Sequence, residues 1–184
     1  MQSPVRTGFF VPEIPMPNDT RIRDAREGDA APIADIYNVH VRSTIVTFEL
    51  DEVACVEMAR RVADVRAHGL PWLVAVDDAG MVLGYAYAST WKARAAYARS
   101  VESSIYLHED ARGCGIGRRL YAALIVRLRE WGAHVVIGGA ALPNDASVAL
   151  HEGLGFTYVG SFREVGQKLG RWIDVGYWQL LLEE

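Results

Sequence analysis

The sequence has little cysteine, no long apolar run and no excess of positive charge. Its two cysteines, Cys55 and Cys114, form no CxxC pair or other metal-ligand spacing, so we expect no metal site and a reduced, cytoplasmic protein. A net charge of −4 argues against a nucleic-acid partner. The longest apolar runs, such as residues 121–126, are too short to span a bilayer. These absences exclude a membrane protein and a disulfide-framed domain.

The composition is that of one globular domain. The 184 residues are 51% hydrophobic and 23% charged, which suits a single domain with a sizeable core. The first twenty residues contain four prolines and lack the charged and then apolar pattern of a signal peptide. We therefore expect residues 1–20 to form an irregular extension and residues 21–184 to form the domain.

The order of predicted elements indicates a mixed α/β or α+β sheet with helices on both sides. Residues 44–50 are either a strand or an ordered loop. Cys55 falls on a predicted amphipathic helix, where a cysteine is usually in the core. Strands are expected at 21–25, on both sides of a turn within 71–89, and at 100–108, 134–141, 156–162 and 174–182, with helices at 28–41, 51–69, 117–132 and 144–155.

A glycine-rich loop, "RGCGIGRR", stands between a predicted strand and a predicted helix. Its spacing fails the dinucleotide fingerprint GxGxxG, because the third position falls on Arg118 when counted from Gly113, and no Gly-Lys-Ser/Thr follows. What remains is Arg-x-x-Gly-x-Gly at 112–117. Such a loop exposes N–H groups at a helix N-terminus, where the macrodipole favours anions. The loop predicts a diphosphate site, and the alternative is a tight turn that happens to be rich in glycine.

The wider context resembles a known family. A strand, Arg-x-x-Gly-x-Gly, a helix, a strand and a short helix ending in "LHEGLGF" follow one another as in the GNAT acyl-CoA N-acetyltransferases, and the resemblance covers residues 21–184. "WKAR" before "VESSIYL" and "LPNDAS" before "LHEGLG" resemble the phosphinothricin / methionine sulfoximine (sulfone) acetyltransferase branch. The resemblance implies the GNAT fold, a central, mostly antiparallel mixed sheet flanked by helices.

The same resemblance implies an activity. Acetyl-CoA would donate its acetyl group, without a metal, directly to the α-amino group of a small amino-acid analogue such as phosphinothricin, methionine sulfoximine or methionine sulfone. Two alternatives stay open: a GNAT enzyme for another amine (a peptide N-terminus, a polyamine or an aminoglycoside), and an acyl-CoA-binding protein without turnover. Branch members are often dimers and the closing strand 174–182 is apolar, so we expect a homodimer.

The resemblance also implies where acetyl-CoA binds. The backbone before the loop would pair with the pantetheine arm like an added strand, and the loop N–H groups would meet the diphosphate. Asn144 matches the family's pantetheine-binding asparagine, and its other interpretation is a helix N-cap. Cys114 is beside the diphosphate and is therefore expected to pack rather than to carry an acetyl group. The expected acetyl-CoA contacts are Ile105, Tyr106, Leu107, Arg112, Gly113, Cys114, Gly115, Ile116, Gly117, Arg118 and Asn144.

Two residues are candidates for the chemistry. Glu102 stands on a largely buried strand, where a carboxylate is costly unless it has a function or a partner, and burial would make it a better base near neutral pH. The resemblance gives Glu102 the base role, directly or through water. His151 stands where many GNAT enzymes have a tyrosine that protonates the leaving thiolate. The imidazole could be that acid, a supporting group, or a locally satisfied helix histidine.

The acceptor is expected to meet cations and a confined pocket. Arginine can bind a carboxylate or a phosphinate through two parallel hydrogen bonds, although a solvated basic loop is the plain alternative. The residues expected to face the acceptor are Phe48, Lys92, Ala93, Arg94, Glu102, Ser103 and Ser104.

Overall fold

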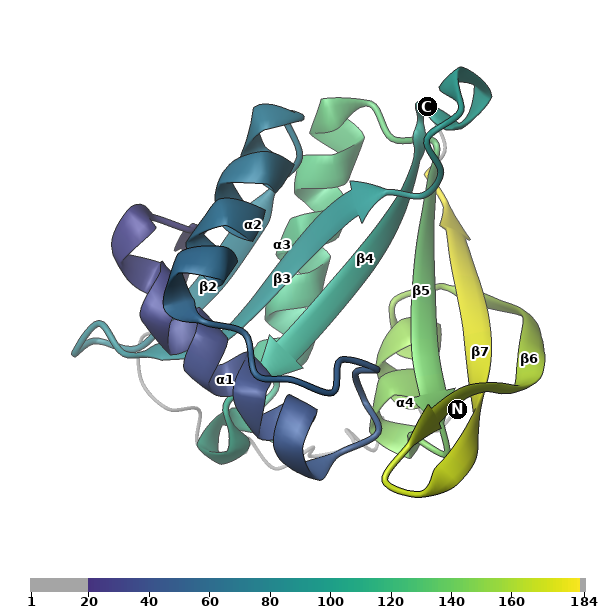
Figure 1. The fold of residues 1–184 in the computed structure, drawn as a ribbon. Helices are drawn as coiled ribbons and strands as arrows, with labels where there is room; N and C mark the ends of the chain where they lie inside the picture. The colour runs from purple at the N-terminus through teal and green to yellow at the C-terminus, as the bar shows by residue number, and fades with distance from the viewer. Residues whose placement is uncertain (1–19, 183–184) are drawn as a thin grey trace, which may run out of the picture.

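The computed structural model describes residues 20–182, so residues 1–19 of the expected extension lie outside the described part. The described chain forms one seven-stranded sheet with four α-helices (Figure 1). The strands are β1 (Arg21–Asp24), β2 (Trp72–Val76), β3 (Val82–Thr90), β4 (Ser100–Leu107), β5 (Val135–Leu142), β6 (Thr157–Lys168) and β7 (Arg171–Leu181). The helices are α1 (Ala30–Ser43), α2 (Cys55–Ala67), α3 (Ile116–Trp131) and α4 (Asp145–Gly153).

The sheet confirms the predicted mixed architecture. Its strand order is β1-β2-β3-β4-β5-β7-β6, and β4–β5 is the parallel pair among antiparallel neighbours. Helices α1 and α2 cover one face, and α3 and α4 lie on the other (Figure 1). Leu120, Leu124 and Leu128 recur every four residues along α3 and are fully buried against the sheet, as the helical period requires.

The segment between α1 and α2 differs from the prediction. Residues 44–50 form a loop, and α2 begins at Cys55 rather than near residue 51. The side-chain amide of Asn38 explains the late start: it donates to the carbonyl of Val53 (3.0 Å) and accepts from the Val53 N–H (2.8 Å), which holds the chain extended there. Cys55 consequently opens the helix at the surface, so the expectation that it belongs to the core is wrong.

The last two strands form a hairpin that is longer than predicted. Leu169 and Gly170 turn it, both with positive φ (51° and 75°), as a two-residue hairpin turn requires. The register shifts between Phe162 and Gly166, where Glu164 has φ 50°. Both edges of β7 are paired, to β5 and to β6, so the closing strand cannot add a second subunit to its edge; β6 is the outer strand instead.

Strands β4 and β5 pair over only half of their length. Ser100–Ser103 lie beside Val135–Gly138, and beyond this point the two strands diverge like the arms of a V (Figure 1). β4 stays paired to β3 on its other side as far as Leu107, and β5 stays paired to β7 as far as Leu142. The sheet is therefore split in its middle.

Candidate active site

The split leaves a cleft whose walls are the two diverging strands. A small cavity of about 50 Å³ lies there, and Ser104, Gly139, Asn144 and His151 are among the residues that line it. Past Ser103 the edge of β4 that faces β5 no longer has a strand partner. Such an edge can receive an extended ligand as if the ligand were another strand. Ile105, Tyr106 and Leu107, which the resemblance gives as pantetheine contacts, are in this stretch of β4.

The glycine loop lies at the end of this edge. Gly113 and Gly115 each have φ 75°, and a Cβ at either would meet no atom within 4 Å, so the backbone there is open to a ligand. Gly115 is the N-cap of α3, whose first-turn N–H groups, from Ile116 onward, have no partner within the helix. The Cys114 thiol lies 3.5 Å from the Arg112 carbonyl, which it faces. The geometry suits a diphosphate.

His151 projects from α4 and is buried, with 4% of its surface exposed. Its Nδ1 lies 2.7 Å from the carbonyl of Ser147, which can only accept, so Nδ1 carries the proton. Its Nε2 lies 3.1 Å from the hydroxyl of Tyr121. Burial lowers the pKa of His151 and so favours the neutral ring, in which Nε2 accepts the Tyr121 hydrogen. In this state His151 has no proton on Nε2 to give.

A polar chain continues behind this contact. The Tyr121 hydroxyl is 2.6 Å from Ser103 Oγ, which is 3.2 Å from the carbonyl of Ile137. A Cβ at Gly138 would overlap His151 Nε2, so the glycine makes room for the ring. Strand alternation places Ser103 on the α3 face, whereas Glu102 is on the α1 face. The Ser103 hydroxyl thus belongs to the histidine side of the cleft.

Glu102 lies on the last paired stretch of β4, opposite Ile137 of β5. It is half-buried, and this burial raises the pKa of its carboxyl, an effect that the nearby Lys92 partly offsets. Gly139 leaves room beside it: a Cβ there would be 3.6 Å from Glu102 Oε1 and 3.2 Å from the ring of Tyr177. A carboxylate with a raised pKa at the mouth of a cleft suits a general base.

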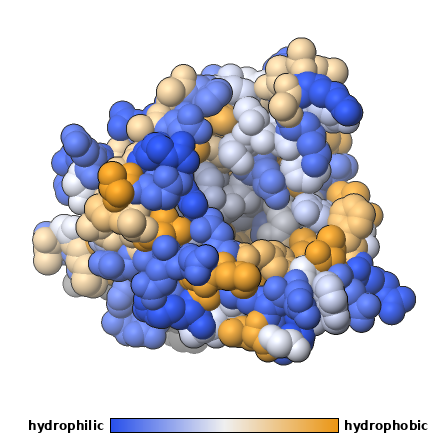
Figure 2. Space-filling view, in the orientation of Figure 1, coloured by the Kyte–Doolittle hydropathy of each residue, from blue (hydrophilic) through white to orange (hydrophobic). Residues whose placement is uncertain are grey.

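Of the other predicted acceptor contacts, Lys92 is the cation that lies near Glu102. Lys92, Ala93 and Arg94 are exposed on the β3–β4 connection, and Lys92 Nζ lies 4.5 Å above the ring of Trp91. Phe48 is 39% exposed on the α1–α2 loop, where its ring fills the space of a missing side chain at Gly166. Figure 2 shows the surface hollowed between α2 and the β6–β7 hairpin.

Sequence reasoning missed the residues that shape the cleft without doing its chemistry. Tyr121 is one of several apolar-looking positions along α3, and nothing in the sequence marks its hydroxyl. Tyr177 borders Glu102 from β7, a contact that only the strand order reveals. The adjacent pair Gly138 and Gly139 was a usable signal, because two glycines inside a strand indicate close approach by other groups. One accommodates the histidine and the other the carboxylate.

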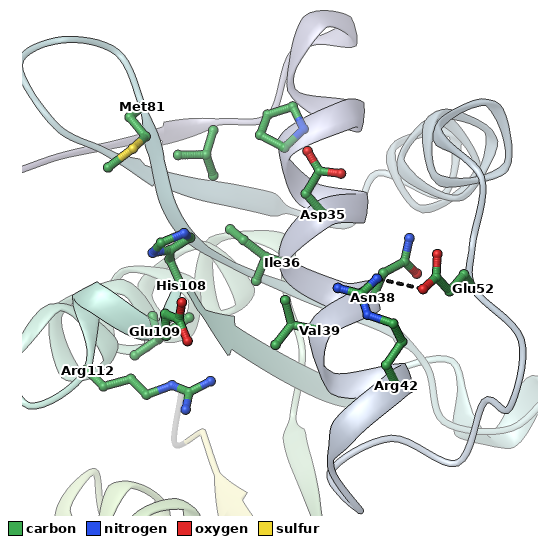
Figure 3. A pocket seen from close by; sticks show the side chains of 13 residues that line it. Asp35, Ile36, Asn38, Val39, Arg42, Glu52, Met81, His108, Glu109 and Arg112 are labelled. Carbon is green, nitrogen blue, oxygen red and sulfur yellow. Dashed lines mark hydrogen bonds and ion pairs between the residues drawn. The ribbon is translucent and has the colours of Figure 1, made fainter.

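A larger cavity of about 460 Å³ lies elsewhere, between α1 and the chain that follows β4. In Figure 3, Asp35 and Val39 of α1 face His108, Glu109 and Arg112 across it. Leu107 and Arg112, two of the expected acetyl-CoA contacts, line this larger cavity, but neither Glu102 nor His151 does. His151 lines the smaller cavity, and Glu102 directly precedes Ser103 and Ser104, which also line it, so the smaller cleft is the candidate site in spite of its size. Within residues 20–182 no cluster of three metal-ligating side chains occurs, and no helix there is long and apolar enough to cross a membrane.

Known proteins are similar to this chain in sequence. A family model described as an acetyltransferase (GNAT) domain matches residues 22–176. The L-methionine sulfoximine/L-methionine sulfone acetyltransferase of Pseudomonas aeruginosa is 42% identical over 165 residues, which cover 88% of this chain and 94% of that protein. The phosphinothricin N-acetyltransferase of Streptomyces coelicolor is 38% identical over 88% of this chain and 95% of its own.

Solved structures share the fold. An acetyltransferase from Salmonella typhimurium, solved with acetyl-CoA, has a TM-score of 0.87 and 36% identity, covering 90% of this chain and 95% of that one. A GNAT-superfamily phosphinothricin acetyltransferase from Sinorhizobium meliloti, in complex with acetyl-CoA, has a TM-score of 0.86 and 39% identity, with coverages of 89% and 88%. The split sheet is therefore the GNAT fold that the sequence motifs implied.

Proposed function

Because this chain belongs to the GNAT acetyltransferase family and is itself an acetyltransferase, we propose that it acetylates the α-amino group of small L-amino-acid analogues. Phosphinothricin, methionine sulfoximine and methionine sulfone are the proposed acceptors, and acetyl-CoA is the donor. The relatives' names support this acceptor class. The carrying observation is the half-buried Glu102 at the point where β4 and β5 separate.

The backbone of β4 and of the glycine loop supports the proposed donor site. The open edge at Ile105, Tyr106 and Leu107 would receive the pantetheine arm, and the N–H groups from Gly113 to Arg118 would receive the diphosphate. Acetyl-CoA supplies the activated thioester. An N–H group on the β4 edge would polarise its carbonyl, as an oxyanion-hole donor does.

Glu102 is the proposed general base. It would take a proton from the acceptor's ammonium group, directly or through a water, and the free amine would then attack the thioester carbonyl in a ternary complex. The C–N bond forms, the C–S bond breaks, and the coenzyme departs as a thiolate. The proton that the new amide nitrogen gives up would pass to this thiolate, directly or through a water. Lys92, Ala93, Arg94, Ser104 and Phe48 would surround the acceptor. Among them, the guanidinium of Arg94 suits a carboxylate or a phosphinate.

His151 is proposed as a supporting residue. Its neutral ring, with Nδ1 protonated and Nε2 accepting from Tyr121, argues against direct proton donation to the thiolate. Asn144 caps α4 by accepting from the Ser147 N–H (3.1 Å), and it lines the cleft beside the ring. Together these side chains would shape the thiol end of the donor site.

The chain is further proposed to act in the cytoplasm as a homodimer. Both of its cysteines are free thiols, which suits a reducing compartment. The β6–β7 hairpin exposes large apolar side chains, including Phe162 and Trp172, of the kind that a second copy would cover. Acetylation of phosphinothricin would make a cell that produces this chain resistant to that herbicide.

Thiol release from acetyl-CoA, followed with a thiol-reactive dye, tests the function. The acceptor panel contains L-phosphinothricin, L-methionine sulfoximine, L-methionine sulfone, ordinary amino acids, an alanine-initiated peptide and an aminoglycoside. Selective turnover of the first three is expected, and Glu102→Gln should lower kcat by about 100-fold or more while acetyl-CoA still binds. Turnover of another amine alone would contradict the proposed acceptor class, and acetyl-CoA binding without any turnover would indicate a non-catalytic protein.

A further inference from the structure

One loop closes the acceptor side of the split. Residues 44–49, which we term the strap, run from the end of α1 across the cleft, and Val46 lines the cavity there. On the β4 side the strap is fixed by two contacts. Tyr37 and Thr47 share a hydrogen bond of 2.6 Å between their hydroxyls, and Arg61 donates to Glu49 at 2.6 Å. The strap is thus anchored to α1 and α2.

The strap is also fixed to the other half of the sheet. Ile45 is buried in a small apolar cluster with Ala141 of β5 and Ile173 of β7. The ring of Phe48 lies against the backbone of Gly166 in β6, where a Cβ would overlap it. The strap therefore bridges the two arms of the V, and its position depends on the β6–β7 hairpin.

Lys168 makes the polar contact of this bridge. It is the last residue of β6 and only 4% exposed. Its Nζ donates to the carbonyl of Thr47 in the strap (2.7 Å) and to the carbonyl of His40 in the last turn of α1 (3.2 Å). A helix C-terminus carries partial negative charge, which favours an ammonium there. Both bonds join segments more than a hundred residues apart.

The hairpin is shaped to bring this ammonium inward. The register shift between Phe162 and Gly166 and the turn at Leu169 and Gly170 bend the hairpin's end, and Lys168 is buried while Gln167 next to it is exposed. Removing the charge of a lysine from water is costly unless polar partners compensate for the lost hydration. Here the ammonium donates hydrogen bonds to main-chain carbonyls of the strap and of α1.

We propose that Lys168 is a positioning residue for the acceptor: it holds the strap, and with it Phe48, at the acceptor entrance of the cleft. The inference rests on the proposed function, since it assigns the strap to the acceptor side. Lys168 acts on affinity for the acceptor and leaves the donor site, which is built from β4 and the glycine loop, unchanged.

The test compares Lys168→Met with Gln167→Met, which places the same side chain on the neighbouring exposed position. Lys168→Met should raise the acceptor KM roughly tenfold while the acetyl-CoA KM stays within about twofold. Gln167→Met should change neither. Gly166→Ala displaces Phe48 and keeps the ammonium of Lys168. It should likewise raise the acceptor KM and leave the acetyl-CoA KM unchanged. Unchanged acceptor KM in both strap variants would overturn the inference.

Hydrogen exchange separates this inference from the proposed function. In Lys168→Met, amides of the strap should exchange at least about tenfold faster, while amides of α3 keep the wild-type rate. Faster exchange throughout the molecule would assign Lys168 to global stability and overturn the inference. If the wild type acetylates none of the panel, the proposed function fails, and the strap exchange still decides whether Lys168 holds the strap.

Discussion

The two arms of the split sheet are covered differently. The β1–β4 arm has α1 and α2 on one face and α3 on the other, and every residue of β2 is buried. The β5-β7-β6 arm has α4 on one face, and its opposite face is free of helices (Figure 1). Nearly all of β6 is exposed. The site lies at the boundary between the arms, where helix cover ends and a ligand can reach the sheet.

Apolar side chains therefore have different roles in the two arms. On the covered arm they form the core that sets the fold. On the open arm several of those on the β6–β7 hairpin are exposed instead, and Figure 2 shows orange patches over β6 and β7 beside the hollow. Those at least half exposed on the hairpin are Tyr158, Val159, Phe162, Val165, Leu169, Trp172 and Leu181. Exposed apolar surface on this scale indicates a surface for binding rather than for folding.

The largest expected effect is on the free energy of unfolding, and it is tested by replacing one leucine in the covered arm and one in the open arm. Leu124→Ala, in the core between α3 and the covered arm, should lower the free energy of unfolding by about 3 kcal/mol, because it leaves a cavity among fully buried neighbours. Leu169→Ala on the hairpin turn, with 57% of its surface exposed, should change it by less than about 0.5 kcal/mol. Urea denaturation measures both. Equal losses would remove the distinction between the arms.

A substitution on the open arm should weaken the proposed dimer rather than the fold. Phe162→Glu places a charge in the exposed apolar patch of β6, where Phe162 also packs edge-on against Tyr177. We expect the dimer dissociation constant to rise at least about tenfold, which is 1.4 kcal/mol, while the subunit stays folded. Sedimentation velocity over a range of concentrations measures this, with Leu124→Ala as the comparison that weakens folding. A wild-type chain that is monomeric throughout would contradict the homodimer.

A smaller effect is expected at the outer end of the covered arm. Asp29 accepts two hydrogen bonds from Arg23 (2.6 and 2.9 Å) and one from the Arg26 N–H (2.7 Å). Asp29→Asn should lower stability by roughly 1–2 kcal/mol near neutral pH. Glu52→Gln breaks an exposed pair with Arg42 and should change stability by less than about 0.5 kcal/mol.

The pH dependence of that loss follows from the direction of the pKa shift. The hydrogen bonds from Arg23 hold the pKa of Asp29 below its usual range. The folded carboxyl is therefore harder to protonate than the unfolded one. Its contribution to stability is present above the unfolded pKa and is lost as the pH falls through the folded pKa. The gap between wild type and Asp29→Asn should close in acid. A gap that stays constant would show that the charge is not what stabilises this corner.

The sequence predicted the covered arm more fully than the open one. Hydrophobic periodicity located α3 and the strands around it, since a buried helix and buried strands leave strong patterns. The full length of the β6–β7 hairpin was not predicted, in part because Glu164 and Leu169 have positive φ. Neither residue type indicates such a backbone conformation. The register shift at residues 162–166 also depends on tertiary contacts.

The candidate site divides in the same way. Its proposed donor half rests on local motifs, the glycine loop and Asn144, which a resemblance in sequence can identify. Its acceptor half is assembled from distant segments: Tyr177 reaches Glu102 from β7, and Lys168 reaches the strap from β6. The order of the strands in the sheet determines such contacts, and this order cannot be predicted from any one segment of the sequence. The polar role of Tyr121 was hidden for the same reason.

The smallest expected effect concerns Glu102, at the boundary between the arms. It is a shift in the acid limb of the pH profile of kcat/KM. Burial raises the pKa of Glu102, and Lys92 partly offsets this rise. A general base must be deprotonated, so kcat/KM should fall as the pH drops through the raised pKa, at a higher pH than for an exposed glutamate. Lys92→Met removes the offset and should move the limb to still higher pH.

The control for this last shift is Arg129→Met, in which an exposed cation of α3, on the opposite face of the sheet from Glu102, is replaced by the same side chain. A limb that moves in Lys92→Met and not in the control assigns the titration to the half-buried carboxyl of Glu102. A limb that does not move in either variant, or that remains in Glu102→Gln, would mean that another group titrates, and the base would then have to be sought elsewhere along the boundary of the two arms.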